Sequence, residues 1–103
     1  MIQVVIYKNH RGFNVTGHSG FAEAGSDIIC AAVSTLVINT VNSLEQFTDD
    51  EFETFFDEDA AAIEVRFPNE PGKEAKLLLD SLVLGLNDVA ESNGYVEIVY
   101  EEE

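Results

Sequence analysis

The sequence predicts an α+β fold: a two-layer sandwich in which one five-stranded, mixed or antiparallel sheet carries two helices on one face. Two long segments show the apolar spacing that is typical of helices, and five short segments are rich in β-branched and aromatic residues. They follow one another in the order β-β-α-β-β-α-β, which favours one sheet covered by helices. A chain of 103 residues, 46% of them hydrophobic, can build one such core but not two, so we expect a single domain over residues 1–103.

A β-hairpin is predicted at the start of the chain. Residues 2–7 and 13–16 have strand character, and the segment between them contains the asparagine and glycine of a turn. The following loop carries Gly17, Gly20 and Gly25, which are conformationally permissive positions. We therefore expect a flexible loop. It either closes over a substrate or only forms tight backbone turns.

The first helix is predicted to begin at Ser26 or Asp27, either of which can cap its N-terminus, and to end near Gln46. No proline or glycine interrupts this segment, and its apolar residues surround most of the helix circumference. A helix of this kind is buried on more than one side. We expect the sheet on one side and another helix, or another subunit, on the other.

The second half of the chain completes the order of elements. The acidic residues 49–59 are interpreted as a strand with a solvated face that leads into a turn, and residues 61–67 as the next strand. Residues 73–92 have helical spacing, residues 95–100 alternate as a last strand, and residues 101–103 form a solvated tail.

The charge of the chain restricts its partners. Twenty acidic residues against five basic ones give a net charge of −15, which argues against direct binding to nucleic acid or to an anionic membrane surface. A basic protein is the compatible partner, although acidity also simply keeps a small protein soluble. The N-terminus lacks the features of a signal peptide, and no apolar run approaches the ~20 residues of a membrane span. One cysteine excludes an internal disulfide, and we expect a cytoplasmic protein.

The single cysteine, Cys30, falls in the first turn of the predicted helix. Unpaired backbone N–H groups and the positive end of the helix dipole are found there, and both favour the thiolate, the nucleophilic form of cysteine. The same amides can bind the oxyanion of a tetrahedral intermediate. With His18 as a base, Cys30 supplies the minimum parts for acyl transfer. The alternative interpretation is that Cys30 is a small apolar residue of a buried helix.

Two neighbours of Cys30 have supporting or alternative roles. Asp27 either caps the helix or orients the ring of His18, and Ser34 lies one turn beyond Cys30, where it can bond the sulfur or the helix backbone. The second histidine, His10, is expected to be solvated in the hairpin turn.

Other chemistries do not fit the sequence. The glycines match neither the dinucleotide fingerprint nor a phosphate loop, and the histidines and cysteine have no zinc spacing. The acidic run lacks the pattern of a calcium loop. We expect no metal and no cofactor.

The stretch from Gly17-His18 through Gly25-Ser26-Asp27-Ile28-Ile29-Cys30-Ala31-Ala32-Val33-Ser34 closely resembles the signature of Prp, the bacterial family of ribosomal-processing cysteine proteases. The resemblance implies a homodimeric protease with Cys30 as nucleophile and His18 as base, with Asp27 and Ser34 at further signature positions. It also implies that the glycine-rich loop orders over the substrate.

The implied substrate is the short N-terminal extension of large-subunit ribosomal protein L twenty-seven, in which apolar and aromatic residues precede the scissile bond. Two alternatives remain open at this point: a non-catalytic acidic module that binds a basic ribosomal protein, and a redox-responsive thiol.

Overall fold

The computed structural model describes residues 2–17, 24–57, 62–92 and 94–101, and the side chains of residues 24–27 are not among what it describes. The elements follow the predicted order: β1 (Ile2–Tyr7), β2 (Gly12–Thr16), α1 (Ala24–Phe47), β3 (Glu53–Asp57), β4 (Ala62–Arg66), α2 (Lys73–Glu91) and β5 (Val96–Glu101), with a short 3-10 turn, η1 (Lys8–His10), between β1 and β2.

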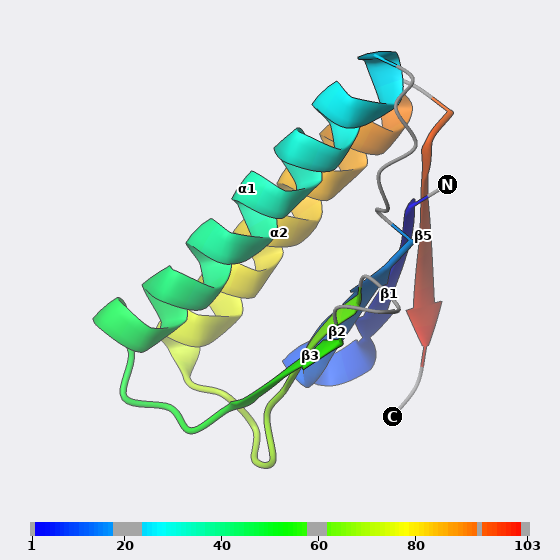
Figure 1. Cartoon of the computed structure of the whole chain (residues 1–103). Helices are drawn as coiled ribbons and strands as arrows, with labels where there is room; N and C mark the ends of the chain where they lie inside the picture. The colour runs from blue at the N-terminus through cyan, green and yellow to red at the C-terminus, as the bar shows by residue number, and fades with distance from the viewer. Residues whose placement is uncertain (1, 18–23, 58–61, 93, 102–103) are drawn as a thin grey trace.

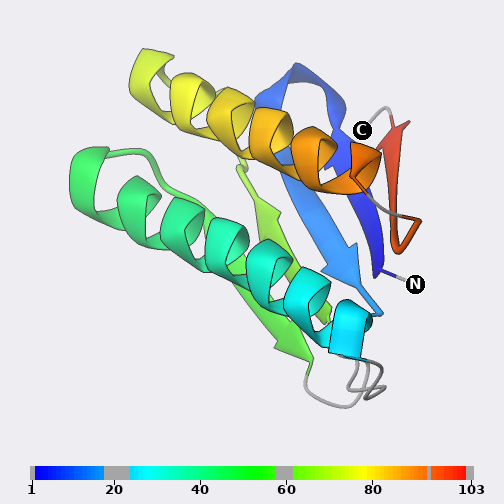
Figure 2. The same cartoon turned by 90° about the horizontal axis from the view of Figure 1, so that it is seen from above.

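The five strands form one mixed sheet in the order β3-β4-β2-β1-β5. β1 pairs in parallel with β5, whereas the β1–β2, β2–β4 and β3–β4 pairs are antiparallel. The two helices run side by side in opposite directions, and both cover the same face of the sheet (Figures 1 and 2). The predicted two-layer α+β sandwich is thereby confirmed.

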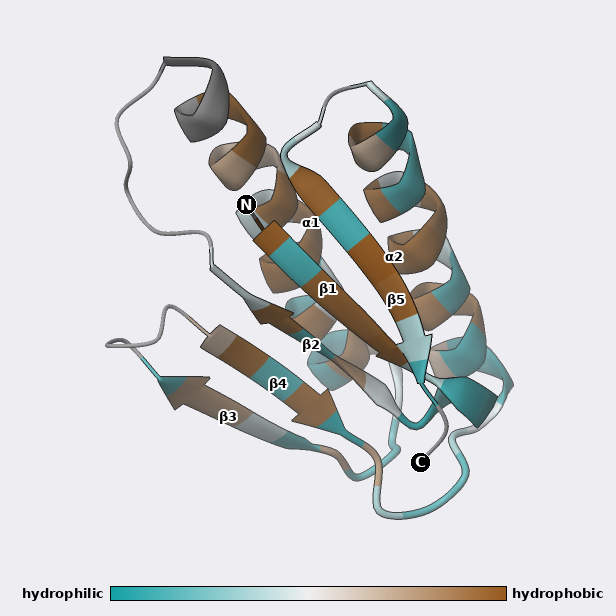
Figure 3. Ribbon diagram, turned by 90° about the vertical axis from the view of Figure 1, so that its right-hand side faces the viewer, coloured by the Kyte–Doolittle hydropathy of each residue, from teal (hydrophilic) through white to brown (hydrophobic). Residues whose placement is uncertain are grey.

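The core lies between that sheet face and the helices. Because strand side chains alternate between the two faces, every second residue of β1, β2 and β4 points toward the helices. Val4, Val15 and Val65 are among the fully buried side chains, and α1 and α2 contribute Val33, Leu44 and Leu86 to the same cluster. Figure 3 shows the opposite face of the sheet, which no described helix covers.

Of the element ends that differ from the prediction, two change the interpretation of nearby residues. α1 begins at Ala24, before the expected caps Ser26 and Asp27, so both of these residues lie within its first turn. β5 continues through Glu101, because that residue still pairs with Tyr7 of β1, so the predicted solvated tail begins later. The expectation that the acidic run has a solvated face is confirmed for β3, in which all five residues are exposed.

The expectation about membrane spans needs correction. The segment Ile28–Phe47 of α1 is long and apolar enough to cross a membrane by length and composition alone. The core helix of a soluble protein meets the same criterion. Val33, Val37 and Leu44 of this segment pack into the core.

Gly12 is the residue on which the hairpin most depends. Its φ is +136°, and a Cβ atom there would lie 1.9 Å from the carbonyl oxygen of Val65 on the neighbouring strand. We expect Gly12→Ala to lower the free energy of unfolding by roughly 3 kcal/mol and the melting temperature by roughly 15 °C. Gly94→Ala is the matched control, because a Cβ at Gly94 would meet nothing within 4 Å. Calorimetry that gave equal melting temperatures for the two variants would contradict this account.

Candidate functional site

The cysteine lies on the side of α1 that faces the core. Cys30 is half-buried and packs against the hydrophobic cluster. Ser34 follows one turn later and is also half-buried. Partial exposure is the environment in which a cysteine can react, whereas a fully buried one is inert.

The start of α1 changes the expected environment of this cysteine. Because the helix begins at Ala24, Cys30 lies in its second turn and not in its first. The unpaired amides and most of the dipole effect belong to the first turn. The N-terminal activation predicted for Cys30 is therefore weaker in this conformation, and its own N–H is not among the free amides.

Other predicted site residues fall partly outside the described part of the chain. His18 and Gly20 lie outside the described residues, and so does the side chain of Asp27. Gly17, the last described residue before His18, has a φ of +81°, a conformation that glycine adopts without strain. Gly25 belongs to the first turn of α1 and not to the loop, which corrects its predicted place.

An apolar groove that sequence reasoning missed lies between the two helices, on the face of α1 away from Cys30. It has a volume of about 570 Å³ and is lined by Ile28, Ala31 and Ala32 of α1 and by Gly85 and Val89 of α2, among others. Ile28 is 68% exposed in it. Such a groove can accept apolar groups of a partner.

His10 was expected to be solvated in the hairpin turn, but its ring contacts the side chain of Asp80. Its Nε2 lies 2.8 Å from Oδ1 of Asp80 on α2, and about a third of its side chain is exposed. The turn places Asn9 and His10 at positive φ, and this contact ties the turn to the helix. No local pattern could have revealed a partner seventy residues away in the sequence.

A polar network crosses the sheet face that the helices leave open. Glu64 accepts hydrogen bonds from the hydroxyl of Tyr7 at 3.1 Å and from the amide of Asn14 at 2.8 Å, and it forms an ion pair with Arg66. The guanidinium carbon of Arg66 lies 4.4 Å from the ring centroid of Tyr7. These residues come from three strands, so the network fixes the register of β1, β2 and β4.

The network shifts the protonation equilibria of its members. Burial by itself raises the pKa of Glu64, but the hydrogen bonds from Arg66, Asn14 and Tyr7 outweigh burial and lower it below its ordinary value of 4.5. Burial and the negative charge of Glu64 raise the pKa of Tyr7 above 10.0. The ionised form of Glu64 therefore stabilises the folded protein.

This shift predicts a specific dependence of stability on pH. Because the folded-state pKa of Glu64 is lowered, its contribution is present above pH 4.5 and is lost as the pH falls through the folded-state value. Urea unfolding should show that Glu64→Gln has a lower free energy of unfolding than the parent at neutral pH. The difference between the two free energies should become smaller as the pH is lowered. A difference that stays constant with pH would contradict this assignment.

The family model of the cysteine protease Prp matches residues 1–97. A comparison with curated protein sequences finds no significant match.

Several solved structures share the fold over the whole chain. The essential ribosomal processing protease Prp from S. aureus, in complex with a substrate peptide, has a TM-score of 0.89 at 24% identity, covering 98% of this chain and 100% of that one. A structure of that protease with a covalently linked product peptide has a TM-score of 0.86 at 25% identity, with the same coverage of 98% and 100%. The protein SMU.848 from Streptococcus mutans has a TM-score of 0.87 at 32% identity, covering 100% of this chain and 99% of that one.

Proposed function

This chain belongs to the Prp family of cysteine proteases and is therefore a hydrolase; on that premise we propose that it is a site-specific endopeptidase with Cys30 as nucleophile and His18 as general base. One observation carries the proposal. A cysteine protease needs a thiol nucleophile, and Cys30 is the only cysteine in the sequence. Cys30 is half-buried and so is not wholly enclosed in the core.

The assignment of His18 rests on the position of the only other histidine. The ring of His10 contacts the side chain of Asp80 on α2. Asp88 follows Asp80 by eight residues, which corresponds to about 12 Å along the helix. Asp88 lines the groove beside the N-terminal part of α1. His10 is thus held away from Cys30, and His18 remains as the base. Asp27 and Ser34 take supporting roles in this proposal.

The proposed reaction has two steps. The Cys30 thiolate attacks the scissile carbonyl, and the tetrahedral intermediate collapses to a thioester as protonated His18 gives its proton to the leaving amine. Water, deprotonated by His18, then hydrolyses the thioester and releases the acid product. The covalently linked product peptide of S. aureus Prp supports a covalent step of this kind.

The proposed substrate is the N-terminal extension of large-subunit ribosomal protein L twenty-seven, in keeping with the name of the S. aureus relative as a ribosomal processing protease. The net charge of −15 suits a basic ribosomal protein as substrate, and the cytoplasm, where ribosomal proteins are made, is the proposed compartment.

We also propose that the protein acts as a homodimer. Ile38, Leu77 and Leu84 are more than half exposed on the two helices, in addition to Ile28 beside the groove. Exposed apolar side chains on adjoining helices favour association with a second copy. Analytical ultracentrifugation should give twice the 11.3 kDa mass of the chain.

The direct test is to incubate the protein with an N-terminally extended form of ribosomal protein L twenty-seven and to weigh the products by mass spectrometry. One cut after the apolar and aromatic residues supports the proposal. A stable, salt-sensitive complex without cleavage would instead support a non-catalytic binding module. A function that required oxidation of Cys30 and involved no proteolysis would support a redox role.

A further inference from the structure

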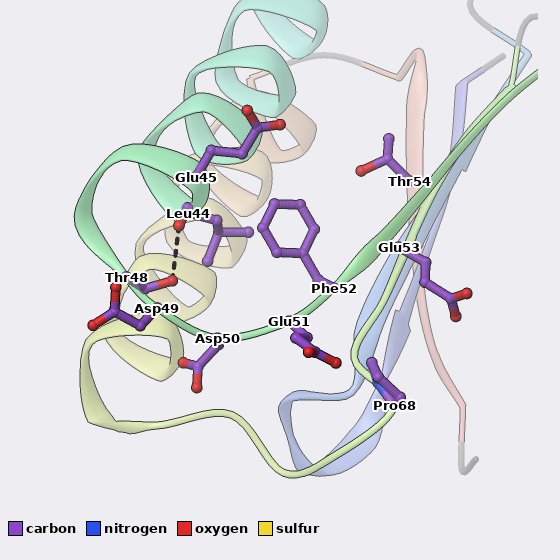
Figure 4. Close-up of a pocket in the computed structure, with 10 residues that line it drawn as sticks. All are labelled: Leu44, Glu45, Thr48, Asp49, Asp50, Glu51, Phe52, Glu53, Thr54 and Pro68. Carbon is purple, nitrogen blue, oxygen red and sulfur yellow. Dashed lines mark hydrogen bonds between the residues drawn. The ribbon is translucent and has the colours of Figure 1, made fainter.

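A second groove lies at the far end of α1, between the end of that helix and the start of β3. Its volume is about 610 Å³. Figure 4 shows the ring of Phe52 between the two elements, near Leu44. The Phe52 ring packs against the ring of Phe67, and the two ring centroids lie 5.6 Å apart. The floor of the groove is thus apolar and held in place.

The rim of this groove carries charge of one sign. Glu45, Asp49, Asp50, Glu51 and Glu53 line it, and none of the described residues that line it is basic. Asp50 accepts a hydrogen bond from the backbone N–H of Gly72 and so has a structural role in holding the start of α2. The other four carboxylates form no ion pair with any residue that the structure describes. An apolar floor with an anionic rim is complementary to a basic segment that also carries apolar side chains.

The outer edge of β3 continues this surface. β3 is the terminal strand of the sheet, so no described strand pairs with its outer edge. Phe55 and Phe56 on it are 52% and 72% exposed. An unpaired edge can add an extended peptide as a further strand. A second copy of β3 is a poor occupant, because Glu53 and Asp57 of the two copies would repel each other.

The groove is separated from the proposed nucleophile. Leu44 follows Cys30 by fourteen residues in α1, which corresponds to about 21 Å along the helix. An extended peptide rises about 3.3 Å per residue, so about six residues bridge this distance. One substrate can therefore contact both places, with the contact at the groove made by residues remote from the scissile bond.

We propose that this groove and the outer edge of β3 form a docking site for a basic, extended segment of the protein substrate. The choice of occupant rests on the proposed function, because a protein that binds ribosomal RNA is rich in lysine and arginine. The segment belongs to the mature protein and begins about six residues beyond the scissile bond. Docking there raises the affinity for the intact protein and leaves the chemical step at Cys30 unchanged.

The test uses a triple variant, Glu45→Gln, Glu51→Gln and Glu53→Gln. Its three side chains are exposed in the parent, and each replacement keeps the size of the side chain. We expect kcat/KM for the full-length extended ribosomal protein to fall about tenfold at low salt, because KM rises while kcat is unchanged. Cleavage of a short peptide that ends four residues after the scissile bond should be unaffected, since it cannot reach the groove.

The matched control is Glu91→Gln, Glu97→Gln and Glu101→Gln. These exposed residues lie at the end of α2 and on β5, which is the strand at the opposite edge of the sheet. Both triple variants change the net charge from −15 to −12, because each removes three negative charges. The control should keep kcat/KM for the full-length substrate within twofold of the parent.

Three outcomes would overturn the docking site. Equal losses of kcat/KM in the two triple variants would show that the net charge of the protein alone attracts the substrate. No loss in the groove variant would show that its carboxylates bind nothing, and an equal loss on the short peptide would place the effect at the catalytic centre.

Binding provides a readout that does not need catalysis. The probe is a fluorescein-labelled peptide of the residues that follow the scissile bond, and its anisotropy should show about tenfold weaker binding to the groove variant than to the control. If the parent protein cleaves no substrate but this difference is present, the proposed function fails and the docking site stands. If cleavage is normal and the two variants bind the peptide equally well, the docking site fails and the proposed function stands.

Discussion

Cys30→Ala is expected to abolish cleavage of the extended ribosomal protein, with a loss of at least about 10⁴-fold in kcat, because the proposed mechanism has no other nucleophile. The chain contains only this cysteine, so no second thiol can replace it. Single-turnover cleavage followed by mass spectrometry measures the residual rate.

The loss must be separated from a folding defect. Cys30 is half-buried, and removal of one sulfur atom from such a position should change stability by no more than about 1 kcal/mol. Asn39→Ala, at an exposed position of the same helix, serves as the control, and it should retain the activity of the parent. A Cys30→Ala variant that cleaves as fast as the parent would eliminate the protease mechanism.

His18→Ala is expected to lower kcat by about 10²- to 10⁴-fold, because the variant lacks the group that moves the proton in both steps. Added imidazole should restore part of the activity, since a free base can do what the missing ring does. Restoration by imidazole would not follow if His18 only shaped the loop.

The second histidine provides the matched control for this variant. His10→Ala removes the contact with Asp80 and should lower stability slightly, while the rate of cleavage stays within about twofold of the parent. If His10→Ala lost as much activity as His18→Ala, the assignment of the base would be wrong.

The sequence predicted the strands and helices well because their signals are local. Residues 2–7 are rich in strand-forming residues and form β1. The helical spacing in residues 73–92 includes Leu82 and Leu86, which are buried on α2. Such patterns follow from the period of a strand or a helix, and the core side of each element can be read from them. The motif around Cys30 likewise lies in one continuous segment.

Helix ends were less predictable. Ser26 and Asp27 are both good caps, yet α1 begins at Ala24 and places Cys30 one turn deeper than predicted. The preference of a residue for a cap is worth only about 1 kcal/mol, so the rest of the structure easily shifts the boundary.

The sequence by itself determined the α+β class, the order of the elements and the single thiol available for chemistry. Only the tertiary structure decided that His10 meets Asp80, that Glu64 joins three strands in one network, and that carboxylates from α1 and β3 surround Phe52. The reason is that periodicity and composition act between residues close in the chain, whereas these contacts join residues from separate segments. Their partners are chosen by how the helices lie on the sheet, and no local pattern encodes that choice.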